Sequence, residues 1–364
     1  MKKKNKFYFS SIDQRTEVVF EDSINSLGSL FAEGNIILVD KKLKKSVSIF
    51  KDSKSLILFL DGAESTKSMA MLTKVLDLVF KNKKIDVNKK TKLVVIGGGT
   101  LGDFGGFLSH ILKRGLPLIM VPSTWLSAMD SAHGGKNGIN FKDIKNQLGT
   151  IYSPQKVILV KSLLNQQPID RTVEGFGELI KISYIHSPKF FKQVSKERLS
   201  SLDLFSYLPT AIDAKYSVVK QDPFETKGIR YLLNFGHTIA HVWEAKLNIH
   251  HGIAVLLGMY FDFLWASVRG YKIDSDIEVF FSSEIVRGVL GLFYNEGLFS
   301  LPDSVVAKTL SADKKKENQF VRYVFPDKAG KLKIESVTVD QIVQEYQRQK
   351  KMIGSSVERQ HSAV

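Results

Sequence analysis

Cysteine is absent from the 364 residues of this chain. Its absence excludes disulfide bridges, cysteine-ligated zinc, iron–sulfur clusters and catalysis by a thiol. Any bound metal must therefore be held by histidine, carboxylates or water. The remaining composition is that of a globular protein, with 43% hydrophobic, 10% aromatic and 24% charged residues. This supplies enough apolar material for one large domain or two smaller ones.

The chain also has no uninterrupted apolar run long enough to span a membrane. Its most apolar stretch, residues 253–268, is interrupted by Asp262 and is shorter than the roughly 20 residues that a spanning helix needs. Residues 1–6 are mostly basic, but no apolar run of signal-peptide type follows them. We therefore expect a buried helix at 253–268, a cytoplasmic protein and no membrane partner.

Basic side chains are in excess, with 52 Lys and Arg against 37 Asp and Glu and a formal net charge of +15. The lysine clusters are scattered, and none carries the interleaved aromatic residues on which bases stack. We expect no nucleic-acid partner. A generally basic surface explains the charge, and local attraction of a small polyanionic substrate is a further use for it.

Short apolar runs alternate with helical patterns in the first half of the chain, which predicts a parallel α/β layer. The predicted strands cover 35–40, 56–60, 93–96, 118–121 and 157–160. After about residue 165 helical patterns dominate, with one strand pair near 320–337. We predict an α/β domain over 1–165 and a mostly helical domain over 166–364.

A glycine-rich turn, Gly97 to Asp103, follows one of these strands and precedes a helical pattern. Its G-x-G-x-x-G spacing lets the backbone approach a pyrophosphate, whose charge a helix N-terminus stabilises. The acid expected some 20 residues downstream is missing, so Asp40 is the candidate for the ribose contact. A tight turn without a ligand is the alternative interpretation.

Two polar segments further along the chain have both a structural and a functional interpretation. The glycine-rich stretch that contains Asp130 and Lys136 is either a solvated loop or a loop that places both side chains against a ligand. Glu178 and Lys181 are three residues apart and share one helix face, either as a surface ion pair or as part of a site.

The histidines give a sharper pattern. His237 and His241 are four apart on a predicted helix, and His251 follows fourteen residues after His237. Three nitrogen or oxygen ligands with one open position are typical of catalytic zinc, and Glu178 is a candidate for the required carboxylate. Histidines that are simply satisfied within the core are the alternative.

Taken together and in this order, these segments resemble 3-dehydroquinate synthase and its sugar-phosphate cyclase relatives. The resemblance runs from about Asp40 to Pro326 and is most specific at 97–106, 121–136, 174–181, 233–241 and 251–259. It implies an α/β N-terminal NAD-binding domain, a mostly α-helical C-terminal domain that binds metal and substrate, and a homodimer.

The resemblance also implies roles for individual residues. The implied metal ligands, for Zn²⁺ or alternatively Co²⁺, are Glu178, His237 and His251. The implied catalytic residues are Asp130, Lys136, Lys181, Glu225 and His241. The implied substrate-binding residues are Arg114, which reaches a neighbouring subunit's site, Asn146, Lys215, Arg230, Asn234 and Lys315. The implied NAD-binding residues are Asp40, Glu64, Lys67, Gly98, Gly99, Asp103, Ser123 and Thr124.

The implied activity is that of a phosphate-eliminating lyase of the shikimate pathway. Its substrate would be a phosphorylated sugar acid, 3-deoxy-D-arabino-heptulosonate 7-phosphate, and its products 3-dehydroquinate and phosphate. The reaction would proceed by transient oxidation with NAD, phosphate elimination, re-reduction and intramolecular aldol closure, so that NAD is regenerated in each turnover.

Several residues depart from the family's pattern. His133 and Asn137 stand where an apolar residue and threonine are usual, and Ile253 replaces a glutamate. These changes leave open a related cyclase with another substrate, of the 2-deoxy-scyllo-inosose synthase type. A metal-dependent alcohol or glycerol dehydrogenase is a more distant alternative. Arg230 favours a carboxylate-bearing substrate, because a guanidinium binds a carboxylate through two hydrogen bonds.

Overall fold

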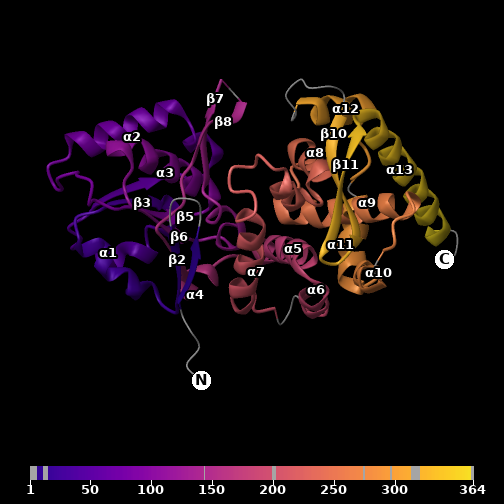
Figure 1. The fold of residues 1–364 in the computed structure, drawn as a ribbon, viewed down its shortest axis with the longest axis horizontal. Coiled ribbons are helices and arrows are strands. Elements are labelled where there is room, and N and C mark those ends of the chain that lie inside the picture. Colours follow the sequence, from indigo (N-terminus) through magenta and orange to yellow (C-terminus); the bar gives the residue numbers. More distant parts are fainter. Residues whose placement is uncertain are drawn as a thin grey trace. The chain divides into compact units, whose positions relative to one another are not determined.

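The structure is a computed structural model that describes residues 6–10, 15–142, 144–198, 202–273, 275–295, 297–312 and 320–361 (Figure 1). It separates into two compact units. Unit 1 comprises Met1–Gly175 and Asp203–Thr226, and unit 2 comprises Phe176–Leu202 and Lys227–Val364. The units divide ten residues later than the predicted position, and unit 1 regains a segment that the prediction gave to the second domain. The domain boundary at residue 165 stays a prediction.

Unit 1 contains a seven-stranded sheet with the order β1-β2-β9-β6-β5-β3-β4. Only the β1–β2 pair is antiparallel, and all other neighbours in the sheet are parallel. The strands are β1 (Lys6–Ser10), β2 (Arg15–Glu21), β3 (Ile36–Asp40), β4 (Leu56–Leu60), β5 (Leu93–Gly97), β6 (Leu118–Pro122) and β9 (Lys156–Val160). The predicted parallel α/β layer is confirmed.

Alternating side chains of these strands bury both faces of the sheet. Ile37 and Val39 of β3 pack in a core cluster with Phe31 of α1 (Gly28–Ala32) and Leu163 of α4 (Lys161–Leu164). Leu38, between them in sequence, faces α3 (Gly99–Ile111) on the other side. Helix α2 (Met69–Lys81) and α3 both contact the strand Lys136–Phe141. Burial on both faces explains why the strands appear as continuous apolar runs rather than as alternating ones.

Most of the segment interpreted as a polar loop has regular structure instead, and only residues 132–135 lie outside it. Residues Ser127–Ser131 form one turn of π-helix, and Lys136–Phe141 is a strand, β7, that pairs antiparallel with β8 (Ile144–Ile151). The loop interpretation was wrong because this hairpin gains its order from pairing and from contact with α3, which a polar, glycine-rich sequence does not reveal.

Helix α7 (Leu204–Val219) also belongs to unit 1, and it packs against the π-turn that contains Asp130. Helix α5 (Ile169–His186) contains the division between the units, at Gly175. Unit 2 is mostly helical, as predicted, and its described residues include one antiparallel strand pair. Its other elements are α6 (Pro188–Val194), α8 (His237–Leu247), α9 (His251–Val268), α10 (Ser275–Phe281), α11 (Glu284–Asn295), α12 (Asp303–Ala312), β10 (Phe320–Lys328), β11 (Lys331–Thr338) and α13 (Val339–His361).

Helix α9 is the most apolar element of unit 2. Its length and composition would suffice to cross a membrane, but 67% of it is buried inside the protein. It packs against α8, β10 and α13. The helix is therefore packed as a core element, in agreement with the prediction for this stretch.

Candidate functional site

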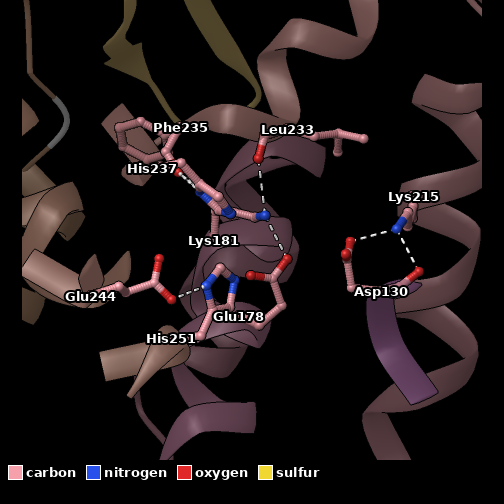
Figure 2. A network of polar contacts seen from close by, with 9 residues as sticks. All are labelled: Asp130, Glu178, Lys181, Lys215, Leu233, Phe235, His237, Glu244 and His251. Carbon is pink, nitrogen blue, oxygen red and sulfur yellow. Dashed lines mark hydrogen bonds and ion pairs between the residues drawn. The ribbon is translucent and has the colours of Figure 1, made fainter. Parts of the chain in front are cut away.

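Three side chains predicted as metal ligands lie together in unit 2. Glu178 lies on α5, while His237 and His251 are the first residues of α8 and α9. One potential ligand atom of each lies within 4.8 Å of the others. Figure 2 shows the three side chains converging. Histidines at helix starts project from fixed backbone positions, so the trio is held by three separate helices rather than by a loop.

Each histidine of the trio is oriented by a hydrogen bond from its Nδ1. His237 Nδ1 donates to the carbonyl oxygen of Phe235 at 3.0 Å, and His251 Nδ1 donates to Glu244 Oε1 at 2.7 Å. A neutral ring with its proton on Nδ1 presents the lone pair of Nε2, the arrangement that metal-ligating histidines adopt. Both rings are therefore in a tautomer suited to hold a cation.

The carboxylate of the trio has one oxygen in use and one without a partner. Glu178 Oε1 lies 2.5 Å from the Nζ of Lys181, which also donates to the carbonyl of Leu233 at 3.0 Å. Glu178 Oε2 is buried and has no hydrogen-bond partner among the described residues. Leaving a buried oxygen unsatisfied costs about 1–3 kcal/mol. A divalent cation would remove that cost, so the donor set fits a metal ion.

Burial and neighbouring charges act in opposite directions on the two rings. Burial lowers the pKa of His237 well below its ordinary value, and the positive charge of Lys181 and the two neighbouring histidines add to the effect. Burial also acts to lower the pKa of His251, but the hydrogen bond and charge of Glu244, with the charge of Glu178, outweigh it and raise that pKa. Glu244 thus makes His251 the more basic of the two rings.

Close backbone contact fixes the spacing between two of the ligand-bearing helices. A Cβ atom on Gly177, the residue before Glu178, would lie 2.1 Å from the carbonyl oxygen of Gly252, the residue after His251. Only glycine permits α5 and the start of α9 to approach this closely. The positions of Glu178 and His251 are therefore coupled through their neighbours.

Other predicted residues of unit 2 lie near this trio in sequence or in space. His241 lies one turn after His237, and their ring centroids are 5.5 Å apart. Arg230 is 5% exposed and lies with Asn234 in a 3₁₀ segment, Ile229–Asn234, that leads into the metal centre. Lys315 lies outside the described residues.

In unit 1, the glycine turn meets the structural requirements for a dinucleotide. Gly98 caps α3 without any side-chain hydrogen bond, which leaves the first N–H groups of the helix available to an anion. A Cβ atom on Gly99 would lie 2.8 Å from the hydroxyl of Ser131, and one on Gly98 would lie 3.2 Å from the Thr124 methyl. Glycine at both positions thus keeps side chains out of the turn and leaves its backbone open to a ligand.

Asp40 ends β3 beside this turn, because β3 and β5 are neighbouring parallel strands. Its carboxylate accepts a hydrogen bond from the N–H of Lys42 at 3.0 Å, and a Cβ atom on Gly62 would lie 2.3 Å from it. Ser123 donates its N–H to the Gly97 carbonyl at 2.9 Å. These residues therefore gather at the carboxyl edge of the sheet, where ligands of open α/β sheets bind.

A second group in unit 1 surrounds the amino group of Lys67, which is 4% exposed. Lys67 Nζ lies 2.8 Å from Asp103 and donates to the side-chain oxygen of Asn146, while Glu64 is 3.8 Å away. Burial raises the pKa of Asp103 although the charge of Lys67 opposes this. The structure thus joins residues implied for NAD with Asn146, implied for the substrate.

Two further ion pairs connect the predicted catalytic residues of unit 1. Lys215 Nζ lies 2.5 Å from Asp130 Oδ1 and also donates to the backbone carbonyl of Asp130, as Figure 2 shows. Lys136 Nζ lies 2.6 Å from Glu225 Oε2. Arg114 lies near the end of α3 with a positive φ of 63°. Lys136 and Lys215 thus already have acidic partners.

Sequence reasoning missed one residue of the metal centre, Glu244. It lies seven residues after His237 and three after His241, so all three share one face of α8. That spacing was a usable signal. Of the departures from the family pattern, His133 is fully enclosed in unit 1, and its Nε2 donates to the Ala128 carbonyl at 2.9 Å.

Comparison with known proteins agrees with this architecture. Residues 57–174 match the family model described as 3-dehydroquinate synthase N-terminal, and residues 175–316 match 3-dehydroquinate synthase C-terminal. The 3-dehydroquinate synthase of Saccharolobus solfataricus is 33% identical over 335 residues, covering 89% of this chain and 93% of its own. That of Alkaliphilus metalliredigens is 33% identical over 291 residues, covering 78% and 79%.

Solved structures with the same fold include two other synthases. A 2-deoxy-scyllo-inosose synthase complexed with carbaglucose-6-phosphate, NAD⁺ and Co²⁺ has a TM-score of 0.74 at 21% identity, covering 94% of this chain and 99% of its own. A 2-epi-5-epi-valiolone synthase from Streptomyces hygroscopicus with NAD⁺ and Zn²⁺ has a TM-score of 0.70 at 18% identity, covering 94% and 98%. At these identities the likeness is one of fold, whereas the match to both halves of one family spans most of the sequence. The chain belongs to the 3-dehydroquinate synthase family.

Proposed function

We propose that this chain is a 3-dehydroquinate synthase that converts 3-deoxy-D-arabino-heptulosonate 7-phosphate to 3-dehydroquinate and phosphate, with NAD and a divalent metal, zinc or cobalt. The proposal rests above all on the trio of buried Glu178 and partly buried His237 and His251. One Glu178 oxygen without a partner among the described residues, and two rings oriented by hydrogen bonds, suit a cation. Membership of the family supplies the reaction. A cytoplasmic location and a homodimer remain predictions.

The cofactors would supply the chemistry that side chains lack, namely a reversible hydride acceptor and a Lewis acid that polarises the reacting hydroxyl. Glu178, His237 and His251 would hold the metal. The turn of Gly98 and Gly99 would receive the pyrophosphate. The remaining residues proposed to bind the dinucleotide are Asp40, Glu64, Lys67, Asp103, Ser123 and Thr124.

The chain's own side chains would bind and orient the substrate. Lys136, Asn146 and His241, with Arg114 from a partner subunit, would hold the phosphate before and after it leaves. Lys215, Arg230, Asn234 and Lys315 would hold the carboxylate and nearby hydroxyls, and Asp130 would contact the reacting hydroxyls. Lys181 would accompany the metal ligand Glu178, and Glu225 would act as an acid in the site.

The existing ion pairs suggest how the substrate would be received. Lys136 is paired with Glu225, and both are partly exposed. An arriving phosphate would compete with Glu225 for Lys136, since charge-assisted hydrogen bonds to phosphate are strong. Asp130 and Lys215 would likewise exchange part of their mutual contact for hydroxyl groups. Lys136 and Lys215 would thus each keep an acidic partner until the substrate replaces it.

One assay tests the proposal: phosphate release and product mass are measured from the heptulosonate phosphate with NAD⁺ and Zn²⁺, with and without a chelator. We expect 3-dehydroquinate, one phosphate per product and no accumulation of NADH. Stoichiometric NADH would identify a dehydrogenase instead. No phosphate release here, but release from a carboxylate-free hexose phosphate, would identify a cyclase of the inosose synthase type.

A further inference from the structure

A buried acid in the middle of the apolar helix α9 has no place in the function proposed above. Asp262 is 1% exposed, and it lies eleven residues after the predicted ligand His251. Its Oδ2 accepts the backbone N–H of Gly236 at 2.9 Å, and its Oδ1 accepts the hydroxyl of Tyr323 on β10. Placing a carboxylate among apolar side chains is costly. The presence of Asp262 in this helix therefore calls for an explanation.

The residue that Asp262 holds, Gly236, directly precedes the predicted ligand His237. Gly236 has a φ of 78°, a left-handed conformation that turns the chain into α8. A Cβ atom on Gly258 of α9 would lie 1.9 Å from the Gly236 carbonyl oxygen, so the two backbones are in close contact. Helix α9 therefore holds this turn twice, once by backbone packing and once by the Asp262 carboxylate.

The turn in its hydrogen-bonded form also determines the ring orientation of His237. The Nδ1 of that ring donates to the carbonyl of Phe235, on the other side of Gly236. Rotation of the Gly236 backbone would move both the start of the His237 side chain and the acceptor of its Nδ1. A group that fixes Gly236 therefore fixes the direction of the ring nitrogen that faces the metal centre.

We propose that Asp262 is a positioning residue for the metal centre: it holds the Gly236 turn so that His237 points at the cation, and Tyr323 holds Asp262. This inference rests on the proposed metal site. Burial raises the pKa of Asp262 to about 8, while the hydrogen bonds from Tyr323 and Gly236 oppose that rise. The buried acid therefore carries an energetic cost that a role in holding Gly236 would explain. An apolar residue would avoid this penalty but would leave Gly236 without its acceptor.

The test compares Co²⁺ binding by Asp262→Asn, by Tyr323→Phe and by a matched control, Gln349→Met. The comparison is made above the Asp262 pKa of about 8, where the carboxylate accepts from both Gly236 and Tyr323, whereas asparagine offers one acceptor oxygen for the two donors. Gln349 is also fully buried, and it donates to the carbonyl of Phe261, the neighbour of Asp262 on α9. The control thus loses a buried hydrogen bond to the same helix without involving Gly236.

We expect Asp262→Asn to weaken Co²⁺ affinity about 10–100-fold, as the loss of outer partners of metal ligands typically does. The visible absorption bands of bound Co²⁺ should change, because the His237 nitrogen moves. Tyr323→Phe should produce a smaller change in the same direction. Gln349→Met should lower the melting temperature but leave the cobalt affinity and spectrum as in the unaltered protein.

Hydrogen exchange of the Gly236 amide in the metal-free protein provides a readout independent of the cation. The Gly236 amide should exchange faster in Asp262→Asn than in Gln349→Met when each variant is measured the same number of degrees below its own melting temperature. If Asp262→Asn and Tyr323→Phe leave both the Gly236 exchange and the cobalt spectrum unchanged, the role of Asp262 is overturned while the metal site stands. Equal loss of affinity in Gln349→Met would also overturn it. Failure of the unaltered protein to bind Co²⁺ would instead overturn the metal site itself.

Discussion

The polar clusters of the two units differ in how their charges are satisfied. In unit 2, Glu178 and Lys181 are at most 3% exposed, and one Glu178 oxygen lacks a partner among the described residues. In unit 1, Lys136 and Glu225 are 54% and 38% exposed and satisfy each other. A buried, incompletely satisfied cluster is ready to receive an ion, whereas an exposed pair exchanges partners at little cost. The Glu178 cluster of unit 2 is thus preorganised, whereas the Lys136–Glu225 pair of unit 1 is not.

The largest effect should follow from His237→Ala, which removes one of three ligands from the preorganised cluster. We expect loss of bound metal and a fall in activity greater than the 10–100-fold typical of losing an outer partner, with the fold retained. Elemental analysis and circular dichroism measure both. His110→Ala, an exposed histidine of unit 1, is the control. Full metal content in His237→Ala would remove the assignment and the contrast between the units.

Glu244→Gln should have the next largest effect, because it weakens the hydrogen bond that orients His251 without removing a ligand. We expect metal affinity to fall about 10–100-fold, measured by competition with a chelator of known affinity. Lys246→Gln, which changes an exposed charge on the same helix, should leave the affinity unaltered. An unchanged affinity in Glu244→Gln would show that the site is held by its three ligands alone.

Arg230→Ala tests whether unit 2 also recognises the substrate's charge. Loss of a charged hydrogen-bond partner costs about 1.5–3 kcal/mol, and we expect that loss in kcat/KM for the carboxylated substrate only. A sugar phosphate without the carboxylate serves as the comparison substrate. Equal losses on both substrates would contradict a role in binding the carboxylate.

Two buried groups, His133 in unit 1 and Asp262 in unit 2, should change the stability of the protein with pH in opposite directions. Burial, with the nearby charge of Lys215, lowers the pKa of His133 in unit 1 to about 3. Its unfolded pKa is about 6.5, so stability is lost as pH falls through that interval. The pKa of Asp262 in unit 2 is about 8, against about 3.9 when unfolded, so stability is lost as pH rises between those values.

Melting temperatures from pH 4 to 8 measure both contributions. Relative to the unaltered protein, His133→Leu should lose less stability toward acid and Asp262→Asn less toward neutral pH. Each contribution is at most about 1.4 kcal/mol per pH unit for one proton. Parallel profiles for the unaltered protein and a variant would mean that its group does not change protonation on folding.

The smallest effect should come from Glu225→Gln, which breaks the exposed pair with Lys136. Such pairs contribute about 0–1 kcal/mol to stability, so we expect the unfolding free energy in urea to fall by no more than that. The corresponding change in unit 2, Lys181→Met, should cost several times as much, because it leaves Glu178 buried without its cation. Similar costs for the two variants would remove the distinction between them.

Much of the fold was predictable because its signals are local. The run at 35–40 became β3 (Ile36–Asp40), and the glycine turn after β5 was placed correctly, since burial on both faces and turn chemistry appear within a few residues. The spacing of His237 and His241 likewise placed both rings one turn apart on one helix. The hairpin of β7 and β8 was missed because its polar strands depend on each other for their structure.

From the sequence alone came the fold class of each half, the histidine pattern and the family resemblance, because periodicity and motif spacing are properties of neighbouring residues. The tertiary structure decided which oxygens and nitrogens meet. Asp262 and Tyr323 are 61 residues apart, and Lys215 is 85 residues from Asp130. Contacts over such separations arise only when packed helices and strands bring distant backbones together, and no local pattern encodes them. Only the tertiary structure therefore revealed the Glu178 oxygen that lacks a partner among the described residues and the hydrogen bond from Gly236 to Asp262.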